Sequence, residues 1–242
     1  MVESGVGRRV FAAIQVFLVS GIPTQIIVFG LLIGTGSVMG ADGTWVTADP
    51  NKISLQFFAM SSLLDTALIA IFIRVLLAIS GERSHDVFLG NRRTRREMAL
   101  GLALIPALYG LVIVMTLAVQ TWFPSLHNVA KNPFEAYMDT PLKAGVFIMV
   151  VMLAGGVREE LQRAFIIHRF EQSLGGAWVG LLIYGVIFSL FHVQQGIDVA
   201  LIVGVLGLVW GLLYIRRRSA VANMVSHAGF DVAQVLLRSL ST

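Results

Sequence analysis

Apolar segments long enough to cross a membrane recur along the chain, and they restrict its fold more than any other feature. A spanning helix needs about 20 apolar residues. Only 13% of the 242 residues are charged, whereas an ordinary soluble domain is about 25% charged. We therefore expect an all-α, polytopic membrane protein with about seven transmembrane helices, at residues 10–37, 54–80, 98–121, 143–169, 177–195, 198–215 and 220–238.

The arginines between these segments predict the orientation of the chain, because cytoplasmic loops are enriched in Lys and Arg. With seven helices and a cytoplasmic N-terminus, every arginine cluster falls on the cytoplasmic side. We thus expect an integral protein of a bacterial or archaeal cytoplasmic membrane. The clusters are Arg8-Arg9, the stretch Arg83 to Arg96 and Arg216-Arg217-Arg218, and the loops expected on the cytoplasmic side are 81–97, 170–176 and 216–219.

The apolar run after Arg8-Arg9 has about 28 residues, whereas a cleavable signal has an apolar region of only about 7 to 15. We expect a retained first helix. The net charge of +4 resides in the short clusters, and without a soluble basic domain we expect no nucleic-acid partner. The absence of cysteine excludes disulfides and thiolate metal sites.

No linker divides the chain, so residues 1–242 are expected to form a single membrane domain. Residues 1–142 would supply the N-terminal helices and an interfacial loop. That loop, residues 122–142, contains three prolines and several aromatic residues, which are favoured at the membrane surface. The helices of residues 143–238 carry most of the intramembrane polar side chains.

The strongest functional signal is a polar cluster inside the fourth apolar segment. A charged residue at the centre of a spanning helix costs about 2.5 to 3.5 kcal/mol, whereas each Leu or Ile returns only about 0.3 to 0.6. Such a cluster therefore needs a reason. It consists of Arg158, Glu159, Glu160, Gln162 and Arg163.

Further polar residues lie in the fifth and seventh segments. His192 ends the fifth, and Asn223, His227 and Asp231 form one stripe with i, i+4, i+8 spacing on the seventh. At 1.5 Å per residue, Glu159 and His192 lie about 24 and 25 Å from the turn that joins their helices. Each could be a structural contact alone, but facing ionisable groups in a membrane predict a functional site.

These residue types suit the hydrolysis of an amide bond. A Glu beside a His can take a proton from water. A second imidazole can donate to the oxyanion that forms at the carbonyl, with Asp231 orienting it or keeping it protonated. The alternative is a zinc ion bound by His192, His227 and Glu159, although no His-Glu-x-x-His motif is present.

In these motifs the chain resembles the CPBP family (CAAX proteases and bacteriocin-processing enzymes, also called Abi), which are intramembrane endopeptidases. The resemblance covers about residues 143–238 and implies catalysis by Glu159 with His192, while His227 with Asp231 would line the oxyanion site. Arg163, Phe188 and Asn223 would have structural or orienting roles. The matching motifs are Glu159-Glu160 with Arg163, Phe188-x-x-x-His192, and His227-x-x-x-Asp231.

One spacing departs from the family pattern. The usual Glu-Glu-x-x-x-Arg is here Glu-Glu-Leu-Gln-Arg, so Arg163 comes one position early. It can pair with Glu159 at i+4 or with Glu160 at i+3, which leaves open which Glu activates water. Because ionised Asp231 can only accept, we expect it to accept from His227, which would then be the oxyanion donor.

The predicted function is an intramembrane endopeptidase that hydrolyses a peptide bond of a membrane-associated or CAAX-like substrate. Its partners would be a peptide or membrane-tethered protein and the lipid bilayer. A mechanism that depends on Glu and needs no cofactor is favoured over one that uses zinc. The alternatives are a non-proteolytic membrane scaffold or regulator that retains the fold, and a proton-coupled transporter, which would require broken helices or inverted repeats.

Overall fold

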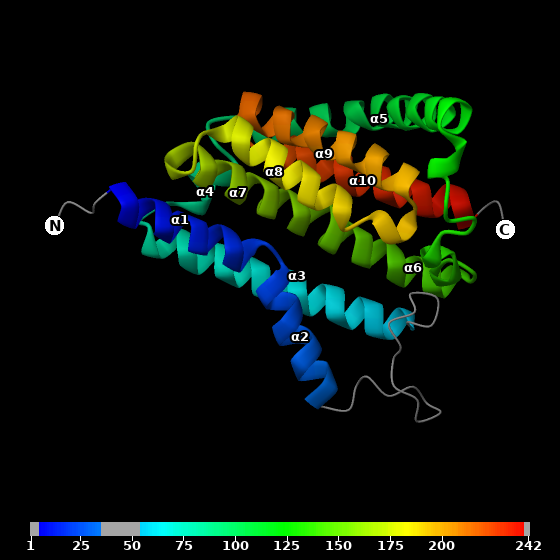
Figure 1. Cartoon of the computed structure of the whole chain (residues 1–242), viewed down its shortest axis with the longest axis horizontal. Helices are drawn as coiled ribbons and strands as arrows, with labels where there is room; N and C mark the ends of the chain where they lie inside the picture. The colour runs from blue at the N-terminus through cyan, green and yellow to red at the C-terminus, as the bar shows by residue number, and fades with distance from the viewer. Residues whose placement is uncertain (1–4, 35–53, 240–242) are drawn as a thin grey trace.

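A computed structural model describes residues 5–34 and 54–239 of the chain (Figure 1). Helices form most of the described part, which contains no strand, and the predicted all-α class is confirmed. Short 3-10 turns connect some of the helices, at Pro124–Leu126 (η2), Pro133–Tyr137 (η3) and Val193–Gln195 (η5). The helices are α1 (Gly5–Val19), α2 (Ile22–Gly34), α3 (Leu55–Ile79), α4 (Ser84–Phe88), α5 (Thr94–Trp122), α6 (Pro141–Val150), the π-helix η4 (Val151–Glu159), α7 (Glu160–Ser173), α8 (Ala177–Leu190), α9 (Ile197–Arg217) and α10 (Val221–Ser239).

Four helices of the described residues are long and apolar enough to span a membrane, and a bent pair brings the total to five. The four are α3, α5, the continuous helix Pro141–Ser173, and α9. The predicted class of polytopic membrane protein is thus confirmed, whereas the count of seven stays a prediction. The fifth expected segment contains only the 14 residues of α8, and the seventh, α10, carries the polar stripe.

The first expected segment is broken, contrary to the prediction of one continuous helix over residues 10–37. α1 and α2 meet at an angle of 41°, and residues 35–37 lie outside the described part. Gly21 adopts a φ of +92° at the break, which glycine tolerates and other residues rarely do. The free carbonyl of Val19 accepts a hydrogen bond of 2.5 Å from Gln162 Nε2. An interrupted helix is therefore present, although the sequence did not indicate one.

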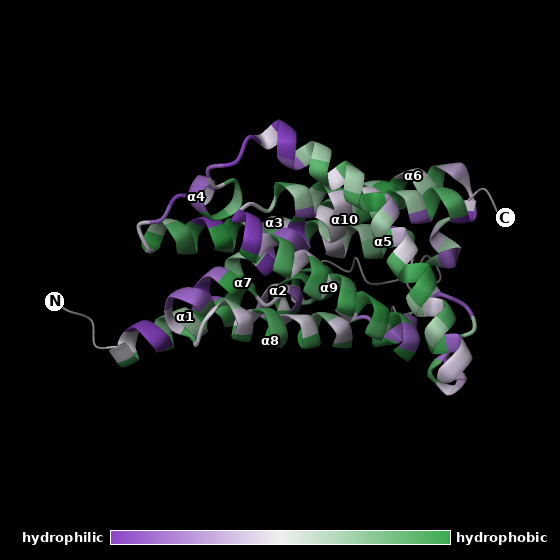
Figure 2. Cartoon of the chain, turned by 90° about the horizontal axis from the view of Figure 1, so that it is seen from above, coloured by the Kyte–Doolittle hydropathy of each residue, from purple (hydrophilic) through white to green (hydrophobic). Residues whose placement is uncertain are grey.

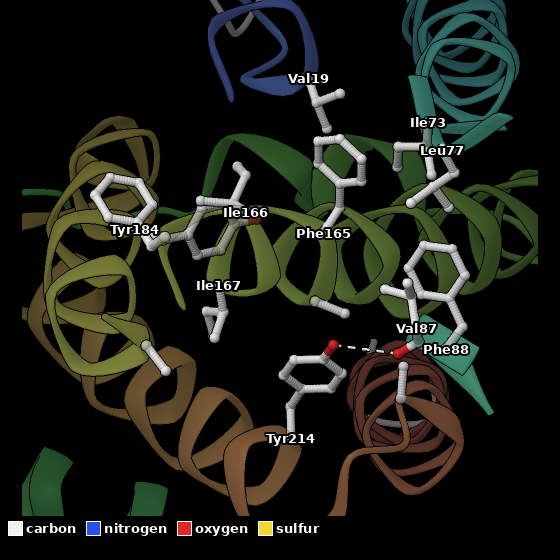
Figure 3. Packing of buried hydrophobic residues seen from close by; sticks show 14 of the residues in the cluster. Val19, Ile73, Leu77, Val87, Phe88, Phe165, Ile166, Ile167, Tyr184 and Tyr214 are labelled. Carbon is white, nitrogen blue, oxygen red and sulfur yellow. Dashed lines mark hydrogen bonds between the residues drawn. The ribbon is translucent and has the colours of Figure 1, made fainter. Parts of the chain in front are cut away.

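The main core surrounds α7, which packs against α1, α3, α4, α8 and α9. Phe165 and Ile167 of α7 are fully buried in it. Figure 3 shows these side chains between Val19 of α1 and Tyr214 of α9, whose hydroxyl donates to the Val87 carbonyl at 3.1 Å. The helix that carries the Glu pair is thus held from several sides.

The three loops expected on the cytoplasmic side meet at one end of the bundle, as the orientation argument predicted. Arg92 Nε donates to the Arg217 carbonyl at 3.4 Å, and the backbone of Ala220 donates to the Phe88 carbonyl at 2.8 Å. Arg218 forms an ion pair with Glu171. Figure 2 shows the hydrophilic ribbon of α4 and the start of α5 at this end. Which side of the membrane it faces stays a prediction.

The predicted interfacial loop lies at the opposite end, where η2 and η3 interrupt it. His127 Nδ1 lies 2.7 Å from Asp198 Oδ2, and the backbone of Ile197 donates to Asn128 Oδ1 at 2.8 Å. These contacts fasten the loop to the start of α9. The other loop expected on this side, residues 39–53, lies outside the described residues.

Candidate active site

A cavity of about 1080 Å³ opens within the bundle, and most of the predicted site residues line it. Its polar wall contains Glu159, His192, His227 and Asp231. Glu160 is not part of the cavity wall, and its side chain is fully buried. The two adjacent glutamates therefore have different environments, which the sequence could not distinguish.

The Glu pair stands at the end of an unusual helical segment. Residues Val151–Glu159 form the π-helix η4, and Glu160 begins the α-helix α7. π-Helical turns are rare and occur frequently at functional sites, because the wider turn changes the direction in which the following side chains point. Nothing in the spacing of apolar residues predicted this change.

Two glycines let α10 approach η4 closely. A Cβ atom at Gly156 would lie 2.4 Å from Ala228 Cβ, and one at Gly155 would lie 2.6 Å from Asp231 Oδ2. A larger residue at Gly156 would also meet the Ala228 backbone and displace α10, whereas one at Gly155 would displace the Asp231 carboxylate. The glycines thus allow the polar stripe of α10 to face the Glu pair.

Glu160 is held by partners on two helices. It forms a fully buried ion pair with Arg163 of its own helix. His227 Nδ1 lies 2.8 Å from Glu160 Oε1, and Asn223 Nδ2 donates to Oε2 at 3.1 Å. Arg163 therefore pairs at i+3 rather than at i+4, and both oxygens of Glu160 are occupied.

Arg163 lies in an aromatic enclosure. Its guanidinium carbon is 4.8 Å from the ring centroid of Phe188, 5.3 Å from that of Tyr184 and 5.6 Å from that of Trp210. Cations are attracted to the faces of aromatic rings, most strongly where water is excluded. The Phe of the Phe-x-x-x-His motif thus supports the arginine of the Glu pair.

Glu159 faces the cavity and keeps one carboxylate oxygen available. Arg158 Nη2 donates to Glu159 Oε1 at 3.3 Å. Glu159 Oε2 lies 3.9 Å from His227 Nε2, which is longer than a hydrogen bond. The Glu159 side chain is 16% exposed.

His192 lies just beyond the end of α8, because that helix ends at Leu190 and not near residue 195 as expected. Its Nδ1 is 2.8 Å from the carbonyl oxygen of Phe188. A carbonyl can only accept, so Nδ1 carries the proton and the Nε2 of a neutral His192 keeps its lone pair. The motif spacing of four residues therefore fixes the tautomer of this histidine.

His227 stacks on Trp210, with ring centroids 3.8 Å apart and planes inclined by 16°. Its Nε2 lies 3.7 Å from Asp231 Oδ2, beyond hydrogen-bond distance. The acceptor for His227 is thus Glu160, which lies within hydrogen-bond distance of Nδ1, and not the expected Asp231. The i+4 spacing placed Asp231 near the imidazole, but a residue of another helix makes the hydrogen bond.

Sequence analysis missed two contributors to the site. Trp210 lies in the apolar helix α9, and nothing but its size marked it. Asp65 lies in the second expected segment and belongs to none of the predicted motifs, but it lines the cavity. Its Oδ2 lies 3.4 Å from Arg158 Nη1.

The predicted zinc ligands are His192, His227 and Glu159. In both His192 and His227, the hydrogen bond described above is made by Nδ1. These partners therefore do not occupy Nε2 of either ring. Within residues 5–34 and 54–239, however, no group of three or more His, Asp and Glu side chains has a metal-binding arrangement. The zinc site at His192, His227 and Glu159 therefore stays a prediction.

Comparison with known proteins gives one match, and it covers the helices that build this site. Residues 141–233 match the family described as type II CAAX prenyl endopeptidase Rce1-like. The match confirms the predicted family. The Rce1-like segment contains every predicted site residue, whereas Asp65 lies outside it. The chain has no significant match among curated proteins or among solved structures.

At family level, the Rce1-like segment supports a CAAX-type intramembrane endopeptidase. This agrees with the apolar helices and with the polar cavity between them. The family implies a protease acting on a membrane-associated peptide within a lipid bilayer.

Proposed function

We propose that this protein hydrolyses a peptide bond of a membrane-associated or CAAX-like substrate with a water molecule activated by Glu159 and His192. The observation that carries the proposal is the shared cavity wall of Glu159, His192, His227 and Asp231. Packing alone does not require four ionisable side chains around one cavity inside a membrane protein.

The different environments of the two glutamates support Glu159 as the general base. Glu160 is occupied by Arg163, His227 and Asn223 and does not reach the cavity. Glu159 has an available oxygen, Oε2, on the cavity side. We therefore assign water activation to Glu159 and an orienting role to Glu160.

The contacts of His227 define when it can act on an oxyanion. Because Glu160 is paired with Arg163 and accepts only, Nδ1 of His227 donates to it. His227 Nε2 can donate to an oxyanion only when the ring also carries a second proton. Asp231, 3.7 Å from Nε2, would then be the nearby negative charge that stabilises the imidazolium.

The reaction follows from these positions. Glu159, assisted by His192, accepts a proton from water as the water oxygen bonds to the scissile carbonyl carbon. His227 Nε2 donates a hydrogen bond to the resulting oxyanion. The proton held by Glu159 then passes to the departing amine nitrogen as the C–N bond breaks, which yields a carboxylic acid and a free amine.

The cavity also contains an apolar region suited to a lipid-like or apolar substrate group. Its wall includes four aromatic rings that contact one another, with centroids 5.3 to 6.0 Å apart. This region and the match to the CAAX prenyl endopeptidase family favour a prenylated peptide as the first substrate to test. The rings belong to Phe58, Phe134, Tyr137 and Phe147.

The test is proteolysis by the purified protein in lipid vesicles. A panel would contain farnesylated CAAX peptides, the same peptides without the prenyl group, and apolar peptides of spanning length, with products identified by mass spectrometry. We expect the wild-type protein to cleave at least one class and the Glu159→Ala variant to cleave none. Equal product formation by the two proteins, or no cleavage by either, would contradict the proposal.

The same assay separates the metal-dependent alternative. Zinc bound through His192, His227 and Glu159 would polarise the carbonyl and lower the pKa of its bound water. Activity that persists in excess chelator, with no metal in the purified protein, supports the mechanism above. Loss of activity in chelator and its recovery with zinc would replace it.

The Arg163–Glu160 ion pair bears on the scaffold alternative. An arginine one position early in the motif favours a non-proteolytic protein, but Arg163 still pairs with a glutamate. Equal activity of the wild-type and Glu159→Ala proteins on every peptide would favour the scaffold. The break between α1 and α2 removes one argument against a transporter, and pH-driven flux in the same vesicles would test that function.

A further inference from the structure

An acidic side chain reaches the site from a helix outside the Rce1-like segment. Asp65 of α3 has a side chain only 7% exposed. Its Oδ1 bonds with the hydroxyl of Thr24, a fully buried residue of α2. A carboxylate in a spanning helix is costly unless it is paired or used, so its partners indicate its role.

The partner of Asp65 is Arg158, which immediately precedes the Glu pair. Arg158 Nη1 lies 3.4 Å from Asp65 Oδ2 and 3.5 Å from Gln162 Oε1. Its Nε donates to the Ala154 carbonyl at 3.1 Å, and its Nη2 donates to Glu159 Oε1 at 3.3 Å. Four oxygen atoms thus fix the direction of this guanidinium.

We propose that Arg158 is a positioning residue for Glu159, and that Asp65 and Thr24 hold Arg158 in the orientation this requires. The inference rests on the proposed function, in which Glu159 activates water. It adds that α2 and α3, which the family match does not include, take part in catalysis.

The geometry shows what Arg158 contributes. It binds Oε1 of Glu159 and leaves Oε2 toward His227 Nε2 and the cavity. A planar guanidinium with several fixed donors can hold a carboxylate in one rotation, whereas a lysine ammonium supplies only a point charge. Arg158 therefore selects the oxygen that is available to water.

A purely structural ion pair would need fewer contacts than Arg158 makes. Asp65 and Arg158 could neutralise each other without a contact to Glu159, and their loss would then lower only stability. Instead one guanidinium joins Asp65 of α3 to Glu159 of the site. A displacement of about 1 Å at a reacting group can reduce a rate 100-fold, so a loss of this connection is expected to reduce kcat.

The main test is the Asp65→Asn variant, with kcat and KM measured on a cleaved peptide in vesicles. We expect kcat to fall about 10- to 100-fold and KM to change less than about twofold, because Asn keeps the size of the Asp65 side chain in the cavity wall. Thr24→Val should give a smaller fall in kcat, and Thr24→Ser, which keeps the hydroxyl, should restore it. A rise in KM at constant kcat would overturn the inference.

A double-mutant cycle tests whether Asp65 acts through Arg158. If it does, adding Asp65→Asn to Arg158→Gln should cause no further loss of kcat, whereas independent sites would lose activity additively. Arg158→Lys should fall nearly as far as Arg158→Gln, because it retains the charge but not the fork. Additive losses, or full activity of Arg158→Lys, would contradict the positioning role.

A matched control separates stability from catalysis. Glu97 is also a buried acid, 1% exposed, and it pairs with Arg217 at the basic end of the bundle. Glu97→Gln should lower the melting temperature but leave kcat per folded molecule unchanged. An equal loss of kcat in Glu97→Gln and Asp65→Asn would show that a buried carboxylate is merely needed for folding.

A structural readout keeps this inference separate from the proposed function. In an experimental structure of the Asp65→Asn protein, the Arg158 guanidinium should turn away from Glu159. If it stays within 3.5 Å of Glu159 Oε1, the inference fails, whether or not any peptide is cleaved. If Glu159→Ala keeps full activity, the proposed function fails instead.

Discussion

Two sets of ion pairs among the described residues differ in whether they leave an atom available to the cavity of the candidate site. The inner network joins Arg158, Glu159, Glu160, Arg163 and His227 inside the bundle. The end network is a set of three separate groups at the basic end, in which Glu82 pairs with His168 and Arg169, Glu97 with Arg217, and Glu171 with Arg218.

The difference lies in what each network leaves available. In the end network, both oxygens of Glu97 accept hydrogen bonds from Arg217, and both oxygens of Glu171 accept from Arg218. In the inner network, Glu159 keeps an oxygen that faces the cavity. Buried charge alone therefore does not identify a reactive site. An available atom on a cavity wall does.

The largest effect on stability is expected from a matched pair of arginine variants in α7. Arg163→Met leaves Glu160 buried without its cation, and removal of one partner of a buried ion pair costs about 3 to 5 kcal/mol. Arg169→Met breaks the pair with Glu82, whose side chain is 21% exposed, and should cost only about 1 kcal/mol. Unfolding in detergent measures both, and equal losses would erase this distinction.

Two histidine variants, one at the cavity and one in the end network, extend the comparison to catalysis. His192→Ala should lower kcat about 100-fold, the lower range for loss of a general acid or base, while leaving the melting temperature nearly unchanged. His168→Ala, in the end network, should leave kcat within about twofold because His168 contacts Glu82 and not the cavity. Peptide cleavage in vesicles supplies both values. Loss of activity in both variants would point to a general structural effect.

The smallest expected effect is the pH dependence that Glu82 gives to stability. Burial opposes its ionisation, but hydrogen bonds from Gln172 and His168 and the charge of Arg169 outweigh this and lower the pKa of Glu82. This stabilisation is fully present above the ordinary pKa of about 4.5 and is lost as the pH falls through the lowered value. A comparison of melting temperature against pH for the wild type and Glu82→Gln measures it. Parallel curves would contradict the assignment.

Much of the architecture could be predicted from sequence because membrane insertion depends on the length and polarity of a segment. The expected segments 54–80 and 198–215 correspond to α3 (Leu55–Ile79) and α9 (Ile197–Arg217). The predicted meeting of the basic loops at one end also follows from charge alone. Glu159 and His192 line one cavity, as their matched depth indicated, and His227 of the seventh expected segment lines it as well.

Features that depend on contacts between helices could not be predicted. At the break near Gly21, the Val19 carbonyl accepts a hydrogen bond from Gln162, a residue distant in sequence. The π-helix η4 ends at the Glu pair and affects the direction in which each glutamate points. The spacing of apolar residues does not distinguish a π-helix from an α-helix here. The acceptor for His227 Nδ1 is Glu160 because α10 packs against η4, whereas sequence spacing pointed to Asp231.

The most direct test of the central claim is the peptide cleavage rate of the Glu159→Gln variant in lipid vesicles. This substitution keeps the size of the side chain but removes its ability to take a proton from water. With the melting temperature unchanged, kcat should fall about 10²- to 10⁴-fold relative to the wild type. A Glu159→Gln protein that cleaves the same peptide at the wild-type rate would contradict the claim.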